Sequence, residues 1–377
     1  MRFPEFSGEW EKYRLCDVAS IVGRIGFRGY TTNDIVTKGK GAIALSPTNI
    51  ENNKLTYDKD NTYISFYKYE ESPEIMIKQG DVIFVKTGST VGKVAYVDKL
   101  ICKTTLNPQV VVLKDIQCDN YLLSVLMSTN KFQNAIRKII VGGAVPTLSQ
   151  AAMGDIVVTM PQATEQEKLS KFISLLDDRI ATQNKIIEDL KKLKSAIRKK
   201  MFSLLKDEYT ESFEINQLLD YEQPTAYIVA NDEYSTDTSL TPVLTANKGF
   251  ILGYTDEKFG IYQKGECIIF DDFTMDAKYV SFPFKVKSSA IKILTAKPNV
   301  NLRFMFEYLS YWELKSEGHK RHYISEIASL VIELPSKERQ SIIASLMTSL
   351  NSKLDIEAKT KIRYEEQKRY LLSQMFI

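Results

Sequence analysis

The stretch from Lys86 to Asp98, KTGSTVGKVAYVD, combines glycine, lysine and hydroxyl side chains at spacings close to those of a phosphate-binding loop. Such a loop has two glycines separated by four residues, then Lys, then Ser or Thr, so that backbone N–H groups surround a phosphate and the hydroxyl binds magnesium. Here only three residues separate Gly88 from Gly92, and Val94, which follows Lys93, has no oxygen for a metal. The apolar, β-branched runs on either side instead predict a strand, a glycine-rich turn and a second strand.

Other residue types that carry chemistry are scarce or poorly spaced. The two histidines, His319 and His322, lie in one short run, which excludes most histidine-based acid–base and zinc chemistry. The four cysteines show no paired short spacing, which indicates reduced thiols and argues against a metal site. The segment LNPQV, Leu106 to Val110, lacks the second Pro and the aromatic residue with which an amino-methyltransferase holds a flipped base. We therefore predict no catalytic residue and no metal ligand, and interpret LNPQV as a turn.

Length and composition indicate an ordinary globular protein of several domains. The chain has 377 residues, of which 44% are apolar, so it can bury substantial cores. No apolar run approaches the roughly 20 residues that cross a bilayer, and no signal peptide is evident, so we predict a cytoplasmic protein. The net charge of +3 is too small to indicate a nucleic-acid partner by itself, and any basic surface must be local.

An internal repeat organises the chain. Residues 161–202 align without a gap on residues 335–376, at a constant offset of 174 from Pro161 to Pro335. Both copies carry apolar residues at alternating steps of three and four, which is typical of a long helix with a coiled-coil seam. Such a helix is about 60 Å long and could not bury its stripe alone, so we predict that the two helices pair. The predicted pairing residues are Ile173, Leu176, Ile180, Ile187, Leu190, Met347, Leu350, Leu354 and Leu371.

The segments before the two helices also correspond, more loosely. The run from Gly80, GDVIFVKTGSTVGKVAYV, aligns with the run from Gly265, GECIIFDDFTMDAKYVSF, in which both turn glycines are replaced. A phosphate cradle would not survive that exchange, whereas a loop that presents different side chains to different targets would vary in this way. We predict an α+β protein with pseudo-twofold symmetry, divided into a β-rich domain (1–159), a helix (160–205), a second β-rich domain (206–334) and a second helix (335–377).

Several segments, taken in this order, resemble the specificity subunits of type I restriction–modification systems. They are RFPEFSGEWEKYRLCDVA, GDVIFVKTGSTVGKVA and TLSQAAMGDIVVTMPQATEQEKLSKFISLLDDRI in the first half, and YEQPTAYIV, DDFTMDAKYV and HYISEIASLVIELPSKERQSII in the second. The resemblance implies two target recognition domains that each read one half of a split, asymmetric DNA site. It also implies an antiparallel coiled coil that serves as a spacer and docks two methyltransferase subunits, with restriction subunits outside. S-adenosylmethionine, ATP and Mg would be bound by those partners, and this chain would bind no cofactor.

For a DNA-reading chain, the candidate contacts are loops in which basic, aromatic, hydroxyl and acidic side chains alternate. Arginine suits guanine and phosphate, and aspartate can accept from cytosine amines. For the loop from Gly23 to Asp34 the alternative is a hairpin turn with solvated arginines, and one of Asp271 and Asp272 could instead have a cap or turn role. The candidates are Arg24, Arg28, Tyr30, Lys86, Thr87, Ser89, Lys93, Asp271, Asp272, Thr274, Lys278, Tyr279, Lys320 and Arg321.

Three alternatives stay open at this point, of which the first is a solitary, non-restricting member of the same family that directs methylation only. Paired helices could hold two β-rich domains apart as a scaffold for protein partners, without DNA. A nucleotide-dependent enzyme built on the turn after Lys86 is the third reading, and it predicts ATP binding that requires Lys93.

Overall fold

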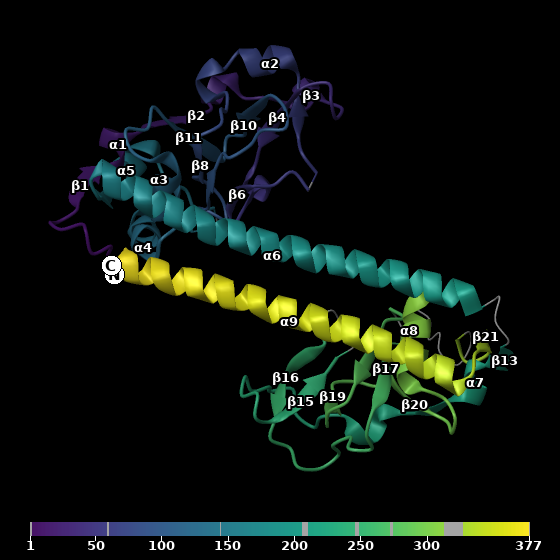
Figure 1. Cartoon of the computed structure of the whole chain (residues 1–377). Coiled ribbons are helices and arrows are strands. Elements are labelled where there is room, and N and C mark those ends of the chain that lie inside the picture. Colours follow the sequence, from purple (N-terminus) through teal and green to yellow (C-terminus); the bar gives the residue numbers. More distant parts are fainter. Residues whose placement is uncertain are drawn as a thin grey trace. The chain divides into compact units, whose positions relative to one another are not determined.

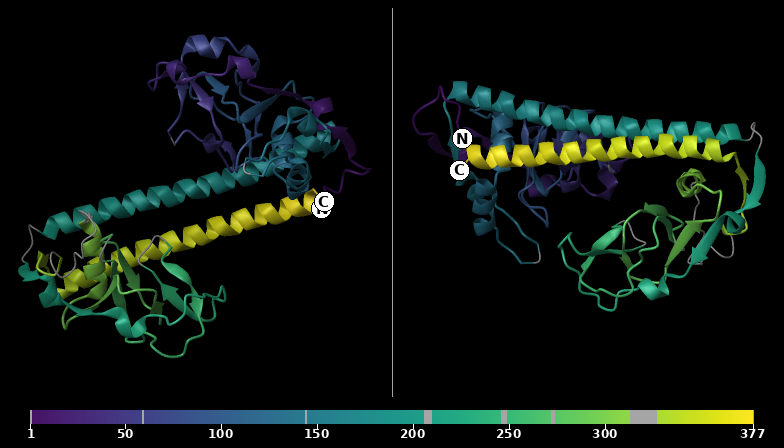
Figure 2. Two further views of the ribbon diagram at one scale, coloured as in Figure 1. Left: turned by 180° about the vertical axis from the view of Figure 1, so that it is seen from behind. Right: turned by 60° about the horizontal axis from the view of Figure 1, so that its bottom comes forward.

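The structure is a computed structural model that describes residues 2–58, 60–143, 145–205, 210–245, 249–271, 274–312 and 327–376. The chain divides into two compact units (Figure 1). Unit 1 contains Met1–Thr182 and Lys361–Ile377, and unit 2 contains Gln183–Thr360. The two ends of the chain therefore belong to unit 1. Near them, Trp10 packs on Phe376 with ring centroids 5.7 Å apart. The N and C labels lie close together in both views of Figure 2.

Unit 1 is built on a six-stranded sheet whose central strands are buried on both faces. Alternate residues of one strand point to opposite faces of a sheet. In β8 (Val82–Val85), Phe84 joins a core shared with the helices, whereas Ile83 joins a second core on the other face. The strand order is β2 (Ser20–Gly23), β11 (Val110–Lys114), β8, β9 (Val94–Tyr96), β6 (Asn53–Leu55), β5 (Ile50–Glu51).

Smaller sheets and short helices complete unit 1. A four-stranded sheet has the order β10 (Thr104–Leu106), β4 (Ala42–Leu45), β7 (Tyr63–Ile64), β3 (Ile35–Val36). Strand β1 (Glu11–Arg14) pairs antiparallel with β12 (Val157–Met160). The helices are α1 (Leu15–Val18), α2 (Phe66–Glu70), α3 (Asn120–Met127), α4 (Asn130–Ile139) and α5 (Gln150–Gly154).

Unit 2 repeats this connectivity with fewer strands. Its main sheet has the order β14 (Leu219–Glu222), β20 (Ile291–Ala296), β17 (Cys267–Asp271), β18 (Ala277–Val280). A second sheet has the order β16 (Ile251–Thr255), β15 (Thr241–Leu244), β19 (Lys285–Val286), and β13 (Glu211–Glu214) pairs with β21 (Val331–Leu334). The remaining helices before the long one are α7 (Ile215–Leu218) and α8 (Leu302–Tyr311). The repeat found in the sequence is therefore a repeat of the fold.

The predicted long helices are α6 (Ala163–Leu204) and α9 (Lys337–Met375). The start of each is tied to its β-rich domain by the same glutamine position. Gln166 donates to the Pro161 carbonyl at 2.8 Å and accepts from the backbone N–H of Asp119, the N-cap of α3, at 2.9 Å. Gln340 donates to the Pro335 carbonyl at 3.0 Å and accepts from the N–H of Asn301, the N-cap of α8, at 2.9 Å. One side chain thus connects two helix starts in each unit.

Replacing Gln166 or Gln340 with Leu should lower the free energy of unfolding by about 1–3 kcal/mol, because two hydrogen bonds are lost and a backbone N–H loses its acceptor. Chemical denaturation of the two variants measures this. Gln367, which is exposed on α9, supplies the matched control, and its change to Leu should shift stability by less than about 0.5 kcal/mol. Equal stability of the three variants would contradict this role.

Segments of α6 and α9 contact each other within each unit. In unit 1, Lys368 binds Asp177, and the guanidinium of Arg179 lies 4.3 Å from the centre of the Tyr364 ring. In unit 2, Lys194 donates to Asn351 at 2.5 Å. Asn351 is the repeat equivalent of Asp177, and Lys368 is the equivalent of Lys194, so the same contact occurs in each unit with the helices exchanged.

A second polar contact joins the two helices in unit 2, where Gln183 donates to the Glu357 carbonyl at 3.1 Å. Within that unit the partner number falls from 357 to 351 as the α6 residue rises from 183 to 194, so the two segments run antiparallel. All nine predicted pairing residues are buried or half-buried. The predicted mixed α and β class with long helices is confirmed. Pairing of the helices over their whole length stays a prediction.

Among the described residues, no helix is both long and apolar enough to cross a membrane.

Candidate nucleic-acid interface

The glycine-rich turn between β8 and β9 is held rigidly on α4. Gly88 and Gly92 have φ angles of +105° and +98°, a backbone region that side chains with a Cβ rarely adopt. Gln133 of α4 donates to the Gly92 carbonyl at 2.8 Å, and a Cβ at Gly92 would lie 2.4 Å from its Oε1 atom. Both glycines are therefore required by the turn itself, which accounts for their spacing without a phosphate.

The backbone donors of this turn are largely used within the protein. The N–H of Gly88 donates to the Pro146 carbonyl at 2.9 Å, and that of Lys86 donates to the Gln109 carbonyl at 2.9 Å. The N–H groups of Val91, Gly92 and Lys93 donate to carbonyls in the same hairpin. A phosphate cradle needs such donors to be available, so the nucleotide-binding interpretation is not supported.

These contacts bring three loops to one end of unit 1. The turn at 86–92 joins the loop at 107–109 through the Gln109 carbonyl and the loop at 141–147 through Pro146. The Leu148 N–H donates to the Lys86 carbonyl at 2.8 Å, and Thr87 forms a bridge with Thr147. We name residues 86–93, 107–109, 141–143 and 145–147 the loop end of unit 1.

The loop end of unit 1 mixes basic, hydroxyl, amide and apolar groups. Ser89 and Lys93 are exposed, and Lys86 and Thr87 are half-buried. Other groups here were not predicted from the sequence: the half-buried amide of Asn107, the exposed amide of Gln109, the exposed Arg137 and Lys138 at the end of the adjoining α4, and Val141 and Val145, which are 75% and 60% exposed. The basic pair could have been found as the exposed end of an amphipathic helix that leads into a glycine-rich loop.

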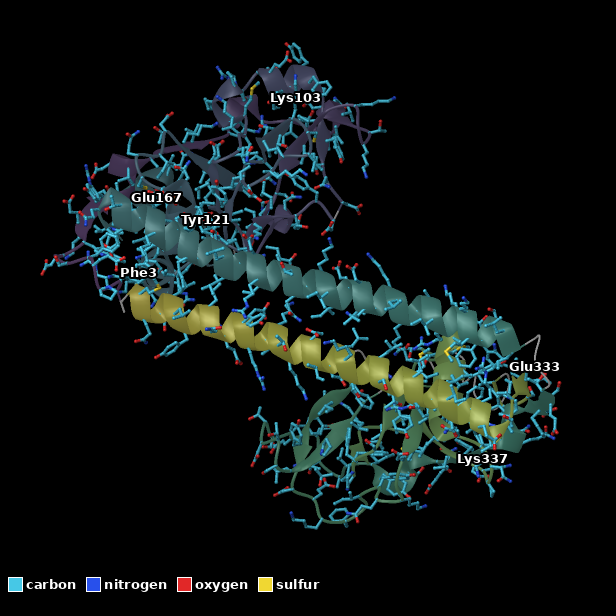
Figure 3. The ribbon with its side chains drawn as sticks, in the orientation of Figure 1. Phe3, Lys103, Tyr121, Glu167, Glu333 and Lys337 are labelled. Atoms are coloured by element: carbon cyan, nitrogen blue, oxygen red, sulfur yellow. The ribbon has the colours of Figure 1, made fainter. Side chains whose placement is uncertain are left out.

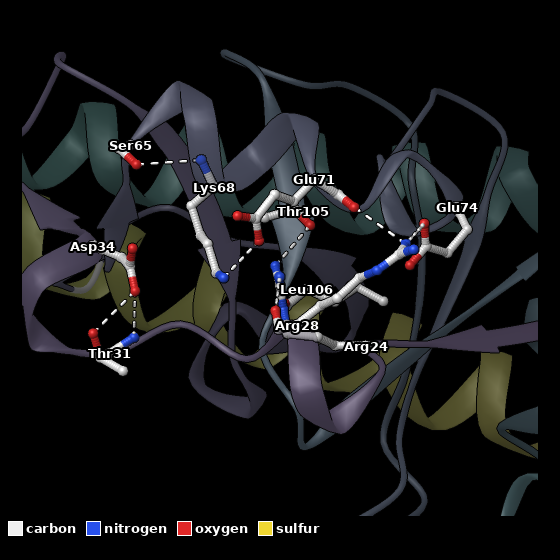
Figure 4. A network of polar contacts seen from close by, with 10 residues as sticks. All are labelled: Arg24, Arg28, Thr31, Asp34, Ser65, Lys68, Glu71, Glu74, Thr105 and Leu106. Atoms are coloured by element: carbon white, nitrogen blue, oxygen red, sulfur yellow. Dashed lines mark hydrogen bonds and ion pairs between the residues drawn. The ribbon is translucent and has the colours of Figure 1, made fainter.

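The arginine-rich loop of unit 1 is instead part of an internal network (Figure 4). Arg24 is 6% exposed and donates to the Leu106 carbonyl at 2.9 Å and to the Thr105 hydroxyl at 3.1 Å. Burial lowers its pKa, and its guanidinium lies 5.4 Å from the centre of the Tyr30 ring. Because these donors point into the protein, we leave Arg24 out of the interface proposed below.

The other two candidates of that loop are only partly accessible. Arg28 donates to the Glu71 carbonyl at 3.2 Å and lies 3.5 Å from a carboxylate oxygen of Glu74. Tyr30 is half-buried, and burial raises its pKa. Their contact with nucleic acid stays a prediction.

The corresponding turn of unit 2 separates its candidates. Asp271 is 3% exposed, and its carboxylate accepts from the Thr274 hydroxyl at 2.8 Å and from the Thr274 N–H at 3.4 Å, as a turn cap does. Thr274 and Lys278 are exposed. Tyr279 is half-buried, with the Arg303 guanidinium 3.8 Å from its ring centre. Asp272, Lys320 and Arg321 lie outside the described residues.

The chain matches a protein family over most of its length. The sequence model described as the type I restriction modification DNA specificity domain matches residues 7–192 and 208–366, and so covers both halves of the repeat.

Curated relatives and solved structures agree with this match. The chain is 39% identical to the EcoR124I/EcoR124II type I restriction enzyme specificity subunit of Escherichia coli over 178 residues, or 42% of this chain and 43% of that protein. It is 23% identical to the putative MjaX specificity subunit of Methanocaldococcus jannaschii over 98% of this chain and 93% of that protein.

Two solved structures show the same fold at 14% identity. The S subunit of a type I restriction-modification system from M. genitalium aligns over 100% of this chain and 99% of its own, with a TM-score of 0.63. A chain from a study of complex assembly and conformational transition of the type I R-M system aligns over 99% and 98%, with a TM-score of 0.56.

Proposed function

Because the chain belongs to the family of type I restriction modification DNA specificity domains, we propose that it selects the DNA sequence on which a type I restriction–modification complex acts. The observation that carries this proposal is the repeated β-rich fold, in which a hairpin with different side chains occupies the same place in each unit. Two related β-rich domains that carry different side chains would suit a DNA site whose two halves differ in sequence.

In this function the chain is a non-catalytic component. Each β-rich domain binds one half of a bipartite, asymmetric site in double-stranded DNA. The long helices pair as an antiparallel coiled coil, set the distance between the readers and dock two methyltransferase subunits, and restriction subunits join that assembly. S-adenosylmethionine, ATP and Mg are bound by the partners, and the complex works in the cytoplasm.

In unit 1, the loop end supplies the groups that this function needs. Lysines that are not buried attract phosphates, whereas hydroxyls and amides can donate and accept at base edges. The valines at 141 and 145 add exposed apolar surface for contact with a thymine methyl group. Rigid backbone contacts between the three loops hold these groups in fixed relative positions.

The competing scaffold function differs in its response to salt. Phosphate contacts make the logarithm of DNA affinity fall with the logarithm of salt concentration, by about 0.9 for each phosphate contacted. The pair Lys86→Ala and Lys93→Ala should weaken binding to any duplex and reduce the steepness of this dependence by about one to two. Titration of labelled duplex at several salt concentrations measures both.

Lys12→Ala, at an exposed lysine on β1, is the control and should leave the steepness unchanged. A wild-type chain that binds no duplex at low salt would support the scaffold function instead.

A further inference from the structure

The loop between β10 and β11 carries one side chain, that of Gln109, on a backbone held by three hydrogen bonds. The Gln109 carbonyl accepts from the N–H groups of Lys86 and Thr87, at 2.9 and 3.3 Å. Its own N–H donates to the carboxamide oxygen of Asn107 at 2.8 Å. The backbone at residue 109 is therefore fixed against the glycine-rich turn.

The side chain of Gln109 is exposed and lies over that turn. Its Nε2 atom is 3.6 Å from the place where a Cβ would stand at Gly88. Its Oε1 atom accepts from the Asn107 amide at 3.3 Å, which orients the group and leaves a second lone pair for another donor. Nε2 makes no hydrogen bond within the part of the chain that the structure describes. A donor and an acceptor thus stand side by side at the surface.

The equivalent loop of unit 2 keeps the backbone contact and lacks the amide. The first residue of β11 pairs with the last residue of β8, and the first residue of β20 pairs with the last residue of β17. The residues before those strands, Gln109 and Ala290, are therefore counterparts. The Ala290 N–H donates to the Ser288 hydroxyl at 3.4 Å, as that of Gln109 donates to Asn107. A position that keeps its backbone contact while its side chain changes suits the reading of two different half-sites.

The surroundings of Gln109 favour a polyanion. Residues 86–93, 107–109 and 130–147, which include the adjoining α4, contain no aspartate and no glutamate. Five positive charges lie in these segments, more than the net charge of +3 of the whole chain. Such a local excess attracts phosphates and would bring a duplex to the amide. The basic residues are Lys86, Lys93, Lys131, Arg137 and Lys138.

The hairpin beneath Gln109 is anchored to the long helix of unit 1. Tyr96, the last residue of β9, packs edge-on against Tyr121 of α3, with ring centroids 5.5 Å apart. The hydroxyl of Tyr121, which is labelled in Figure 3, donates to the Asp177 carboxylate of α6 at 2.6 Å. A base contact made from this hairpin therefore has a fixed position relative to the part of α6 that belongs to unit 1.

We propose that Gln109 reads an adenine in the half-site bound by unit 1, through hydrogen bonds to the N6 amine and the N7 atom in the major groove. This inference rests on the proposed function and names one base contact within it. Adenine presents a donor beside an acceptor, as a carboxamide requires, whereas guanine presents two acceptors. The exposed hydroxyl of Ser89 can either donate or accept, so by itself it does not distinguish these bases.

The first test measures duplex binding by the full chain, with 7-deazaadenine in place of each adenine of that half-site in turn. This analogue lacks only the N7 acceptor. The half-site of unit 1 is the half that persists in the methylation map when residues 206–334 are exchanged. One replacement should weaken binding by wild type about tenfold, and the same replacement should leave the affinity of Gln109→Ala unchanged.

The second test maps methylated positions in cells that carry Gln109→Ala and the methyltransferase partner. One A·T position of that half-site should accept other bases, while the other half and the spacing are retained. The matched control is Gln117→Ala, at an exposed glutamine just beyond the opposite end of β11 that donates to the Asp115 carbonyl at 2.8 Å. The control should leave the map unchanged.

Several results would overturn the inference while the proposed function stands. They are an unchanged map with Gln109→Ala, a loosened G·C position, a half-site without adenine, or wild-type binding that is insensitive to every 7-deazaadenine. Because Gln109 is exposed, its alanine variant should keep its thermal midpoint, and the measurement on wild type needs no substitution at all. A wild type that binds no duplex and directs no methylation would overturn both.

Discussion

Replacing Arg198 with Met is expected to lower the free energy of unfolding by about 3–5 kcal/mol, because it leaves a buried carboxylate without its main partner. Glu307 of α8 is fully buried and accepts two hydrogen bonds from Arg198, at 3.0 and 2.6 Å. Lys194 lies 3.8 Å from the same carboxylate, and Asn351 donates to it at 3.2 Å. Burial lowers the pKa of Lys194, and the nearby Glu307 opposes that shift. This cluster joins α6, α8 and α9 within unit 2.

Two further variants separate the buried charge from a general effect of losing an arginine. Arg179→Met removes an exposed guanidinium from α6 in unit 1 and should lower stability by less than about 1 kcal/mol. Arg198→Met combined with Glu307→Leu should recover much of the loss, since apolar replacements of a buried ion pair are often tolerated. Urea denaturation followed by circular dichroism measures all three. If Arg198→Met alone were as stable as wild type, Glu307 would be adequately solvated without Arg198.

An aspartate at Ile173 or Met347 is expected to lower the free energy of unfolding by more than about 4 kcal/mol. The two residues occupy the same position of the repeat, and each is fully buried on its long helix. A carboxylate there either stays charged without a partner or binds a proton at neutral pH, and both are unfavourable. In each variant, the contacts between the β-rich domain and its long helix should be lost before the rest of the unit unfolds.

The control for these variants is Leu175→Asp, because the Leu175 side chain on α6 is 59% exposed. This change should alter the free energy of unfolding by less than about 1 kcal/mol. The milder changes Leu176→Asp and Leu350→Asp, at half-buried seam positions, should weaken helix pairing and methyltransferase docking together. Thermal unfolding and assembly with the methyltransferase measure the two effects separately. Full stability of the Ile173 and Met347 variants would contradict the packing described here.

The long helices were predictable because their signal is local. A stripe at steps of three and four, repeated at a fixed offset, identifies both the helix and its buried face without knowledge of the rest of the fold. Helix α6 runs from Ala163 to Leu204, so it begins three residues and ends one residue inside the predicted limits of 160–205. Helix α9 runs from Lys337 to Met375, two residues inside each predicted limit of 335–377. The shared Gln166 and Gln340 were visible as identities, but their role was not, since each binds a helix cap distant in sequence.

The candidate contacts were less predictable because exposure depends on residues far away in the chain. Arg24 follows a short strand and precedes glycines, as a DNA-reading loop could, yet its acceptor is the carbonyl of Leu106, 82 residues later. Asp271 is the last residue of a strand, where a carboxylate can either point into solvent or cap the following turn. In the structure it caps the turn by accepting from the Thr274 hydroxyl. In contrast, the turn at Lys86 kept its predicted place between two strands because both flanking runs are short, apolar and adjacent.

The most direct test of two separate readers is to exchange residues 206–334 for the corresponding domain of a relative and map methylated positions in genomic DNA. Cells that carry the original chain, the exchanged chain or neither are compared, each with the methyltransferase partner. One half of the methylated site should change, with the other half and the spacing between them retained. A change in both halves, or in neither, would contradict the division of recognition between the two units.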